Sequence, residues 1–212
     1  MNTPLESIYT SHHEKVRGRG FVLMQEERGG FIRSRVRDGS KVLDIGCRDG
    51  GLTAEYVGKA GSVCGLDIDA GALEIAKKLG IETIQVDLNG PWNIEPRSFD
   101  HVVAAEVVEH LYYPDEVFRK IAEVLKPGGT VLGTVPNAFS LRNRARYLMA
   151  SKQHTPLMDP THINHFTVRE LTGLLEARFT DVRVIGAGRL GKLAERFPQE
   201  FAFDLFFEAT AP

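Results

Sequence analysis

The sequence predicts an α/β fold, in which buried parallel strands alternate with helices. The first observation is the stretch KVLDIGCRDGG at residues 41–51, where a short apolar run turns into glycines before a predicted helix at about residues 52–58. The second is the apolar run at residues 62–66, which ends in Asp67 and precedes a helical pattern over residues 70–79. Because 212 residues with 42% apolar content can bury one sizeable core, we expect a single domain.

The glycine turn and Asp67 together indicate a nucleoside-binding site. Glycines let a ligand approach the backbone, and the first N–H groups of the following helix face that ligand. Asp67 follows Gly46 by about 20 residues, the separation at which a carboxylate meets the hydroxyl pair of a ribose. A dinucleotide-binding turn would read Gly-x-Gly-x-x-Gly, whereas this one reads Asp-x-Gly-Cys-x-x-Gly. The pattern therefore argues against a nicotinamide-dependent oxidoreductase and for a nucleoside that need not carry phosphates.

The later elements follow from apolar periodicity and from helix-breaking residues. The amphipathic run 114–125 is a predicted helix with Val117, Ile121 and Val124 on its buried side, and the KPGG at residues 126–129 ends it. Further helices are predicted at residues 21–36, around residues 142–146 and at residues 168–177. Strands are predicted at residues 81–88, 99–105, 130–135, 180–185 and 201–207, with residues 189–199 inserted before the last one.

Composition limits the kinds of binding partner that we expect. The formal net charge of −2 gives no overall basic field, so a nucleic-acid partner is not expected. No run of about 18 apolar residues exists, so we expect no membrane partner. The two cysteines, Cys47 and Cys64, fall in predicted core strands, which is typical of a reduced cytoplasmic protein. A small-molecule substrate is the remaining expectation, and both a monomer and a homodimer stay open.

Four motifs in order resemble those of the class I S-adenosylmethionine-dependent methyltransferases, of the small-molecule type. They are residues 42–51, 65–69, 86–88 and 125–129, and the resemblance extends more loosely to about residue 186. It implies a Rossmann-like, doubly wound sheet of seven strands in the order 3-2-1-4-5-7-6, with the last strand antiparallel, in a three-layer αβα sandwich. One departure is Arg48, where the family usually has a third glycine.

The resemblance also implies the cofactor and its contacts. We expect S-adenosyl-L-methionine to bind and S-adenosyl-L-homocysteine to leave as product. Asp67 would hold the ribose, Asp87 would accept from the adenine amino group, and Glu106 would face the methionine part. The full expected set of cofactor-binding residues is Asp44, Gly46, Cys47, Gly50, Asp67, Ile68, Asp87, Leu88 and Glu106.

We expect one methyltransferase domain over residues 1–212, organised in four parts. Residues 1–38 form an N-terminal cap or lid, with His12, His13, Lys15, Arg17 and Arg19 near the substrate mouth if it closes. Residues 39–135 form the cofactor-binding core, residues 136–166 a substrate loop, and residues 167–212 a C-terminal helix and hairpin. The substrate loop is too long for a simple connection, and loops of that length are usually functional.

The sequence Glu-x-x-Glu-His at residues 106–110 has two interpretations. Helical spacing would place Glu106, Glu109 and His110 on one face, where the acids orient the cofactor and His110 relays a proton. We expect no metal on this interpretation. The alternative is a divalent cation held by Glu106, Glu109, His110 and His162, a motif that also occurs in metal-dependent RNA 2′-O-methyltransferases.

The substrate loop supplies the remaining candidates. Asn137, Arg142, Arg144 and Arg146 are the expected substrate-binding residues, because guanidinium groups suit phosphate and carboxylate. The expected catalytic bases are His162, His165 and His110, in that order. The sequence thus predicts methyl transfer to an O or N atom of a small, anionic metabolite such as a sugar or nucleotide-sugar. The alternatives are the metal-dependent RNA enzyme and a cofactor-binding module without activity.

Overall fold

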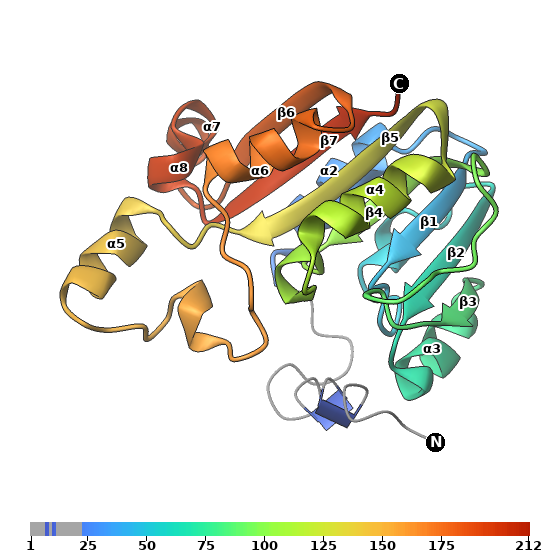
Figure 1. Ribbon diagram of the computed structural model, residues 1–212, viewed down its shortest axis with the longest axis horizontal. Helices are drawn as coiled ribbons and strands as arrows, with labels where there is room; N and C mark the ends of the chain where they lie inside the picture. The colour runs from blue at the N-terminus through green and yellow to red at the C-terminus, as the bar shows by residue number, and fades with distance from the viewer. Residues whose placement is uncertain (1–6, 9, 12–22) are drawn as a thin grey trace.

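The computed structural model describes residues 7, 8, 10, 11 and 23–212. One sheet of seven strands runs in the order β3-β2-β1-β4-β5-β7-β6 (Figure 1). The five parallel strands are β1 (Lys41–Ile45), β2 (Ser62–Asp67), β3 (Glu82–Gln85), β4 (Phe99–Ala105) and β5 (Leu125–Pro136). The strand β7 (Asp204–Thr210) runs antiparallel to its neighbours β5 and β6 (Thr180–Ala187). The predicted fold and strand order are confirmed.

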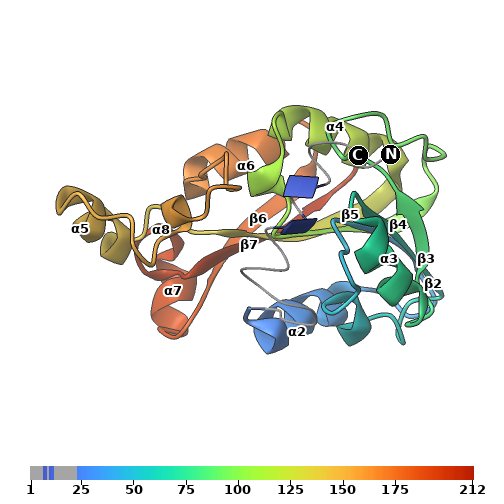
Figure 2. The same ribbon diagram turned by 90° about the horizontal axis from the view of Figure 1, so that it is seen from below.

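Helices cover both faces of this sheet. Figure 2 shows α2 (Gln25–Arg35) on one side and α4 (Pro114–Val124) and α6 (Val168–Glu176) on the other. Side chains alternate between the faces along each strand, so β1 sends Val42 to the core under α2 and Leu43 and Ile45 to the core under α4 and α6. The helix α3 (Ala70–Lys77) adds Ala76 to the α2 side.

The predicted helix at residues 52–58 is wrong in type. Only a 3₁₀ helix, Thr53–Glu55, forms there, within a run of turns. Gly51 and Gly58 bound a segment too short to support an isolated helix. In a 3₁₀ turn, side chains three residues apart lie in line, and the hydroxyls of Thr53 and Tyr56 both donate to Asp44 Oδ2 at 2.5 Å. These two hydrogen bonds favour the tighter turn.

Two strand boundaries also differ from prediction. The KPGG segment lies inside β5, because the strand already pairs at Leu125 with Phe99 and the backbone of Gly128 and Gly129 exchanges hydrogen bonds with Ala211. The last strand begins at Asp204, since the preceding residues form the short helix α8 (Pro198–Phe201). The expected insertion is therefore two short helices, α7 (Lys192–Arg196) and α8.

The loop after β5 carries the helix α5 (Leu141–Leu148) and a 3₁₀ helix, Pro156–Met158. Figure 1 shows α5, α7 and α8 at one end of the molecule, with α3 and β3 at the other. Among the described residues, no helix is long and apolar enough to cross a membrane. The charged residues expected near the substrate mouth, His12, His13, Lys15, Arg17 and Arg19, lie outside the described residues, as do residues 1–6 and 9 of the predicted lid.

Candidate active site

A cavity lies where the carboxyl ends of β1, β2 and β4 meet, the edge at which parallel α/β sheets bind ligands. Gly50 does not line it but packs behind the turn, where a Cβ atom would come within 2.8 Å of Ile81 Cδ1. The other expected cofactor residues all contribute to its lining: Asp44, Gly46, Cys47, Asp67, Ile68, Asp87, Leu88 and Glu106.

The turn after β1 needs a glycine at its first position. Gly46 has a φ of 72°, and a Cβ atom there would come within 2.6 Å of Val107 Cγ2. Arg48 also takes a left-handed φ, of 52°, which is a strained conformation for a residue other than glycine. Its backbone N–H donates to Asp67 Oδ2 at 2.9 Å. The arginine thus keeps the backbone shape of the turn despite its side chain.

Asp44 supports the turn from below. Its side chain is 5% exposed and accepts hydrogen bonds from the hydroxyls of Thr53 and Tyr56. Burial raises the pKa of Asp44 to about 6, while the two hydroxyl donors act to lower it. Two neutral donors therefore hold a carboxylate that faces the cavity.

Asp67 is fixed by the backbone at the end of β2. Its Oδ1 accepts from the N–H of Asp69 at 2.9 Å, while its Oδ2 accepts from the N–H of Arg48. Burial raises the pKa of this carboxyl, and the backbone donors act against that rise. A carboxylate oriented in this way can still accept hydrogen bonds from a ligand, because each oxygen has more than one acceptor site.

The far wall of the cavity comes from the segment after β3. Asp87 Oδ1 accepts from the backbone N–H and the side-chain amide of Asn89, at 2.9 and 3.0 Å. Leu88 is buried at 6% exposure, and its carbonyl accepts from the Trp92 indole at 3.0 Å. The segment thus presents an acceptor and an apolar surface side by side, which suits an adenine ring.

The structure adds a cavity residue that sequence reasoning missed. Arg28 of α2 is 3% exposed, and its Nη2 lies 2.8 Å from Glu106 Oε2 and 2.5 Å from Asp204 Oδ2. Burial alone would lower the pKa of Arg28, but the two carboxylates raise it. Burial and Glu106 raise the pKa of Asp204 to about 7, against the lowering effect of Arg28. No local pattern marks this pair, since Arg28 and Asp204 are 176 residues apart.

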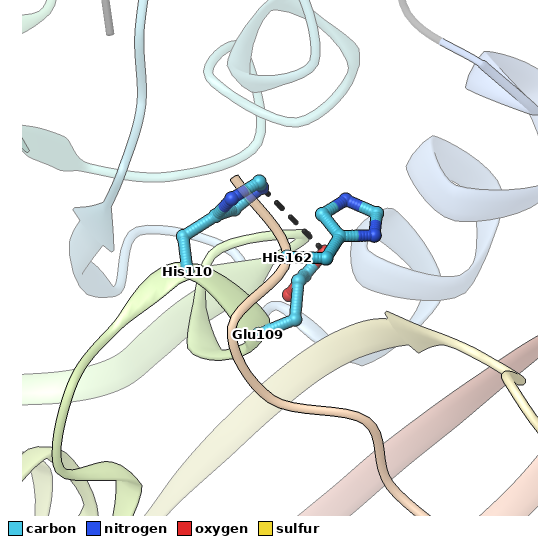
Figure 3. Close-up of side chains that lie close together, drawn as sticks. All are labelled: Glu109, His110 and His162. Atoms are coloured by element: carbon cyan, nitrogen blue, oxygen red, sulfur yellow. Dashed lines mark ion pairs between the residues drawn. The ribbon is translucent and has the colours of Figure 1, made fainter. Parts of the chain in front are cut away.

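Two predicted bases, His110 and His162, meet at the cavity edge with Glu109 (Figure 3). Their rings pack edge to face with centroids 4.7 Å apart, and one ligand atom from each of the three residues lies within 4.8 Å of the others. Only His110 lines the cavity itself. His110 Nδ1 lies 2.9 Å from the carbonyl oxygen of Thr161, and His162 Nδ1 lies 3.1 Å from that of Pro156.

Glu106 stands apart from this cluster. The predicted helical face does not form, because Glu106 has a φ of 55° and the 3₁₀ helix Val108–His110 begins after it. Its carboxylate turns to Arg28 instead. Of the four alternative metal ligands, the structure therefore groups three, Glu109, His110 and His162.

The expected substrate residues of the loop lie elsewhere. Asn137 is 1% exposed and donates to the carbonyls of Pro198, Gln199 and Ala202 at 3.0 to 3.1 Å. Its side-chain oxygen accepts from the backbone N–H of Phe139 at 3.2 Å. This asparagine ties the loop to α8, and the two N–H donors of its amide are directed to these carbonyls. Its role in substrate binding stays a prediction.

The arginines of α5 and His165 also lie outside the cavity lining in the described chain. Arg142 is exposed, Arg144 donates to the Phe139 carbonyl at 2.7 Å, and Arg146 is half-buried. His165 is half-buried beside the Pro156 carbonyl, and burial lowers its pKa. Of the three predicted bases, His110 therefore lines the cavity, and His162 packs against it.

Comparison with known proteins agrees with this geometry. A family model described as a methyltransferase domain matches residues 25–179. A ubiquinone biosynthesis O-methyltransferase from Vibrio cholerae is 30% identical over 176 residues, which are 70% of each chain. One of the same name from Klebsiella pneumoniae is 39% identical over 119 residues, 53% of this chain and 47% of the relative.

Solved structures share the fold. An S-adenosylmethionine-dependent methyltransferase from Archaeoglobus fulgidus superposes with a TM-score of 0.68 at 20% identity, covering 95% of this chain and 99% of that one. Phosphoethanolamine N-methyltransferase 2 from Haemonchus contortus, in complex with S-adenosyl-L-methionine, gives 0.67 at 18% identity over 95% of this chain and 59% of that one. With the family match, the fold and the cavity taken together, the chain belongs to the class I S-adenosylmethionine-dependent methyltransferases.

Proposed function

We propose that this enzyme transfers a methyl group to a hydroxyl oxygen of a small aromatic molecule, of the kind that ubiquinone biosynthesis requires. The observation that carries the proposal is the position of His110, which lines the same cavity as the candidate cofactor residues. A hydroxyl acceptor must lose a proton during methylation, and an imidazole can take it. The name O-methyltransferase of the similar proteins also favours oxygen over nitrogen.

The sugar and nucleotide-sugar acceptors expected from sequence lose their main support. That expectation depended on Arg142, Arg144 and Arg146, and these side chains do not contribute to the described cavity lining. Apolar side chains do contribute, and those outside the expected cofactor set include Leu23, Leu52, Val107 and Leu111. They suit the faces of aromatic rings better than a sugar.

The residues of the cavity fit S-adenosylmethionine. The fit rests on the tight turn at Gly46, where a Cβ would collide with Val107 of the cavity wall, and on the opposite charges of Arg28 and Glu106 beside it. We assign Asp67 to the ribose hydroxyls and the Asp87–Leu88 segment to the adenine. Arg28 and Glu106 would bind the carboxylate and the ammonium of the methionine part. The cofactor supplies a methyl group that its sulfonium centre already activates, so the protein must chiefly orient the acceptor and remove its proton.

The hydrogen bonds of His110 select its tautomer. The carbonyl oxygen of Thr161 can only accept, so Nδ1 of His110 carries a proton and Nε2 of the neutral ring has a lone pair. Nε2 lies 3.9 Å from Glu109 Oε1, and Glu109 is 1% exposed. A proton taken up at Nε2 would therefore be stabilised by a buried carboxylate.

The same cluster supports a second use of these side chains. His162 Nδ1 faces the Pro156 carbonyl, so its Nε2 also has a lone pair when the ring is neutral. Two imidazoles and one carboxylate would suit Mn²⁺ or Zn²⁺ better than Mg²⁺. We therefore retain a divalent cation at Glu109, His110 and His162 as the alternative to a proton relay.

The test is a methyl-transfer assay with radiolabelled S-adenosylmethionine and two water-soluble acceptors, 3,4-dihydroxybenzoate and UDP-glucose. We expect label in the phenol and none in the nucleotide-sugar. Transfer to UDP-glucose alone would contradict the proposal.

Two further experiments test His110 and distinguish a proton relay from a bound cation. His110→Asn should lower turnover by about 10²- to 10⁴-fold while S-adenosylmethionine still binds. Treatment with EDTA distinguishes the two uses of the cluster: activity that survives it favours the proton relay, and activity that returns only with Mn²⁺ favours the cation. Lys78→Gln, a change of an exposed residue that directly follows α3 and does not line the cavity, is the control.

A further inference from the structure

One end of the molecule exposes a group of large apolar side chains. This distal tip consists of α5 with the following residues to 152, and of residues 189–200, which include α7 and α8. Figures 1 and 2 both place these helices together at one end. Leu148 is 90% exposed and Met149 is 70% exposed. The other exposed apolar side chains of the tip are Leu141, Leu190, Leu193 and Phe197.

The same end of the molecule is cationic. Its exposed basic side chains are Arg142, Arg144, Lys152, Arg189, Lys192 and Arg196. Its acidic side chains are Glu195 and Glu200, and Glu200 lies 4.0 Å from Arg144. The whole chain has a formal net charge of −2, so basic residues are concentrated here and not spread evenly. Apolar side chains among exposed cations are the pattern of helices that bind at membrane interfaces.

We propose that the distal tip docks on the surface of an anionic lipid bilayer. The charge of the tip decides between occupants, because two copies of this cationic surface would repel each other. Leu148 and Met149 offer neither stacking surfaces nor hydrogen bonds to nucleic-acid bases, whereas they can enter the apolar layer below lipid headgroups.

The proposal goes beyond the methyl-transfer activity and revises the expectation of no membrane partner. That expectation rested on the lack of an apolar span, and a surface contact needs no span. The tip is also close to the active site along the chain, since the loop that leaves α5 at Met149 leads to His162. A docked enzyme would thus hold that loop near the bilayer, from which a lipid-soluble acceptor could be taken.

The test is sedimentation of the full chain with two kinds of vesicle, without cofactor or acceptor. One contains phosphatidylglycerol in phosphatidylcholine, and the other contains phosphatidylcholine alone. We expect binding to the anionic vesicles that weakens as salt is raised. The double variant Leu148→Ser, Met149→Ser should lose at least tenfold in affinity. The double variant Lys192→Gln, Arg196→Gln should lose about fivefold for each cation removed.

Matched changes at the opposite end are the controls. Ile84→Ser removes a side chain that is 40% exposed on β3, and Lys78→Gln removes an exposed cation after α3. Both should bind vesicles as the natural chain does. Equal binding to both kinds of vesicle, no binding, or binding that the tip variants leave unchanged would overturn the proposal. So would a dimer that dissociates in the Leu148→Ser, Met149→Ser variant.

S-adenosylmethionine affinity, measured on every variant, reports that each is folded. Because vesicle binding is measured without methyl transfer, a failure here leaves the proposed function intact. Likewise, failure of the methyl-transfer assay would leave the vesicle-binding result unaffected.

Discussion

Replacing Arg28 by methionine tests the buried charges that border the cofactor cavity. In the natural chain, Arg28 lies between Glu106 and Asp204, at 2.8 and 2.5 Å, and the side chains of these two residues are 11% and 1% exposed. Removing one partner of a buried ion pair leaves uncompensated charge, which typically costs about 3–5 kcal/mol. For a chain of this size, each kcal/mol lowers the melting temperature by about 2–4 °C. We therefore expect Arg28→Met to melt roughly 6–20 °C lower at pH 8.

The loss should depend on pH with a definite sign. Burial raises the pKa of Asp204 from 3.8 to about 7, and without Arg28 it would rise further. A carboxyl with a raised pKa in the folded state binds a proton that the unfolded state has released, so stability falls as pH rises from about 4 through the folded pKa. The deficit of the variant relative to the natural chain should thus be small at pH 5 and large at pH 8.

Thermal unfolding followed by circular dichroism at both pH values measures this. Arg178→Met is the matched control, because Arg178 also binds a carboxylate through two nitrogens, at Asp115, but at the exposed surface. That change should cost about 1 kcal/mol or less. A deficit for Arg28→Met that is no larger than the control's, or that is equal at pH 5 and pH 8, would refute the reasoning.

Three other predictions concern the cavity. His110→Asn should lower kcat by about 10²- to 10⁴-fold while the Kd for S-adenosylmethionine stays unchanged. Single-turnover kinetics and calorimetry measure the two quantities, and equal effects on both would contradict the role of His110 as the base. Gly46→Ala should abolish cofactor binding, because its Cβ would lie 2.6 Å from Val107 Cγ2. Adding Val107→Ala should restore part of the affinity in the same titration. Tight binding by the single variant would contradict the close approach of this turn to Val107. Tyr56→Phe should lower the free energy of unfolding at pH 8 by about 1.5–3 kcal/mol, because the ionised Asp44 loses a charge-assisted donor. Burial raises the pKa of Asp44 to about 6, so the loss should shrink below that pH. Urea titrations above and below pH 6 measure the loss, and a loss that does not depend on pH would argue that Asp44 does not ionise in this range.

Local patterns were enough to predict most of the fold. The stretch at residues 41–51 predicts its own strand and turn, and Asp67 marks the end of the next strand. These features depend on neighbours in sequence, such as apolar residues followed by glycine. The strand order came from the resemblance of four motifs, and the sheet has that order.

The parts that prediction missed depend on contacts between distant segments. Arg28 meets Asp204 across 176 residues, and only the packing of α2 against β7 brings them together. The amide of Asn137 suggests a substrate contact until α8 folds over it. Glu106 looked like a member of one helical face, but its left-handed backbone directs it to Arg28.

The most direct test of the central claim is a calorimetric titration of the full chain with S-adenosyl-L-methionine. The natural chain should bind one equivalent. Asp67→Ala should lose about 10- to 100-fold in affinity, because a carboxylate that accepts from hydroxyls contributes about 1.5–3 kcal/mol. Glu74→Ala, an exposed change on α3, should bind as the natural chain does. No binding by the natural chain, or equal binding by Asp67→Ala, would contradict the assignment of this cavity to the cofactor.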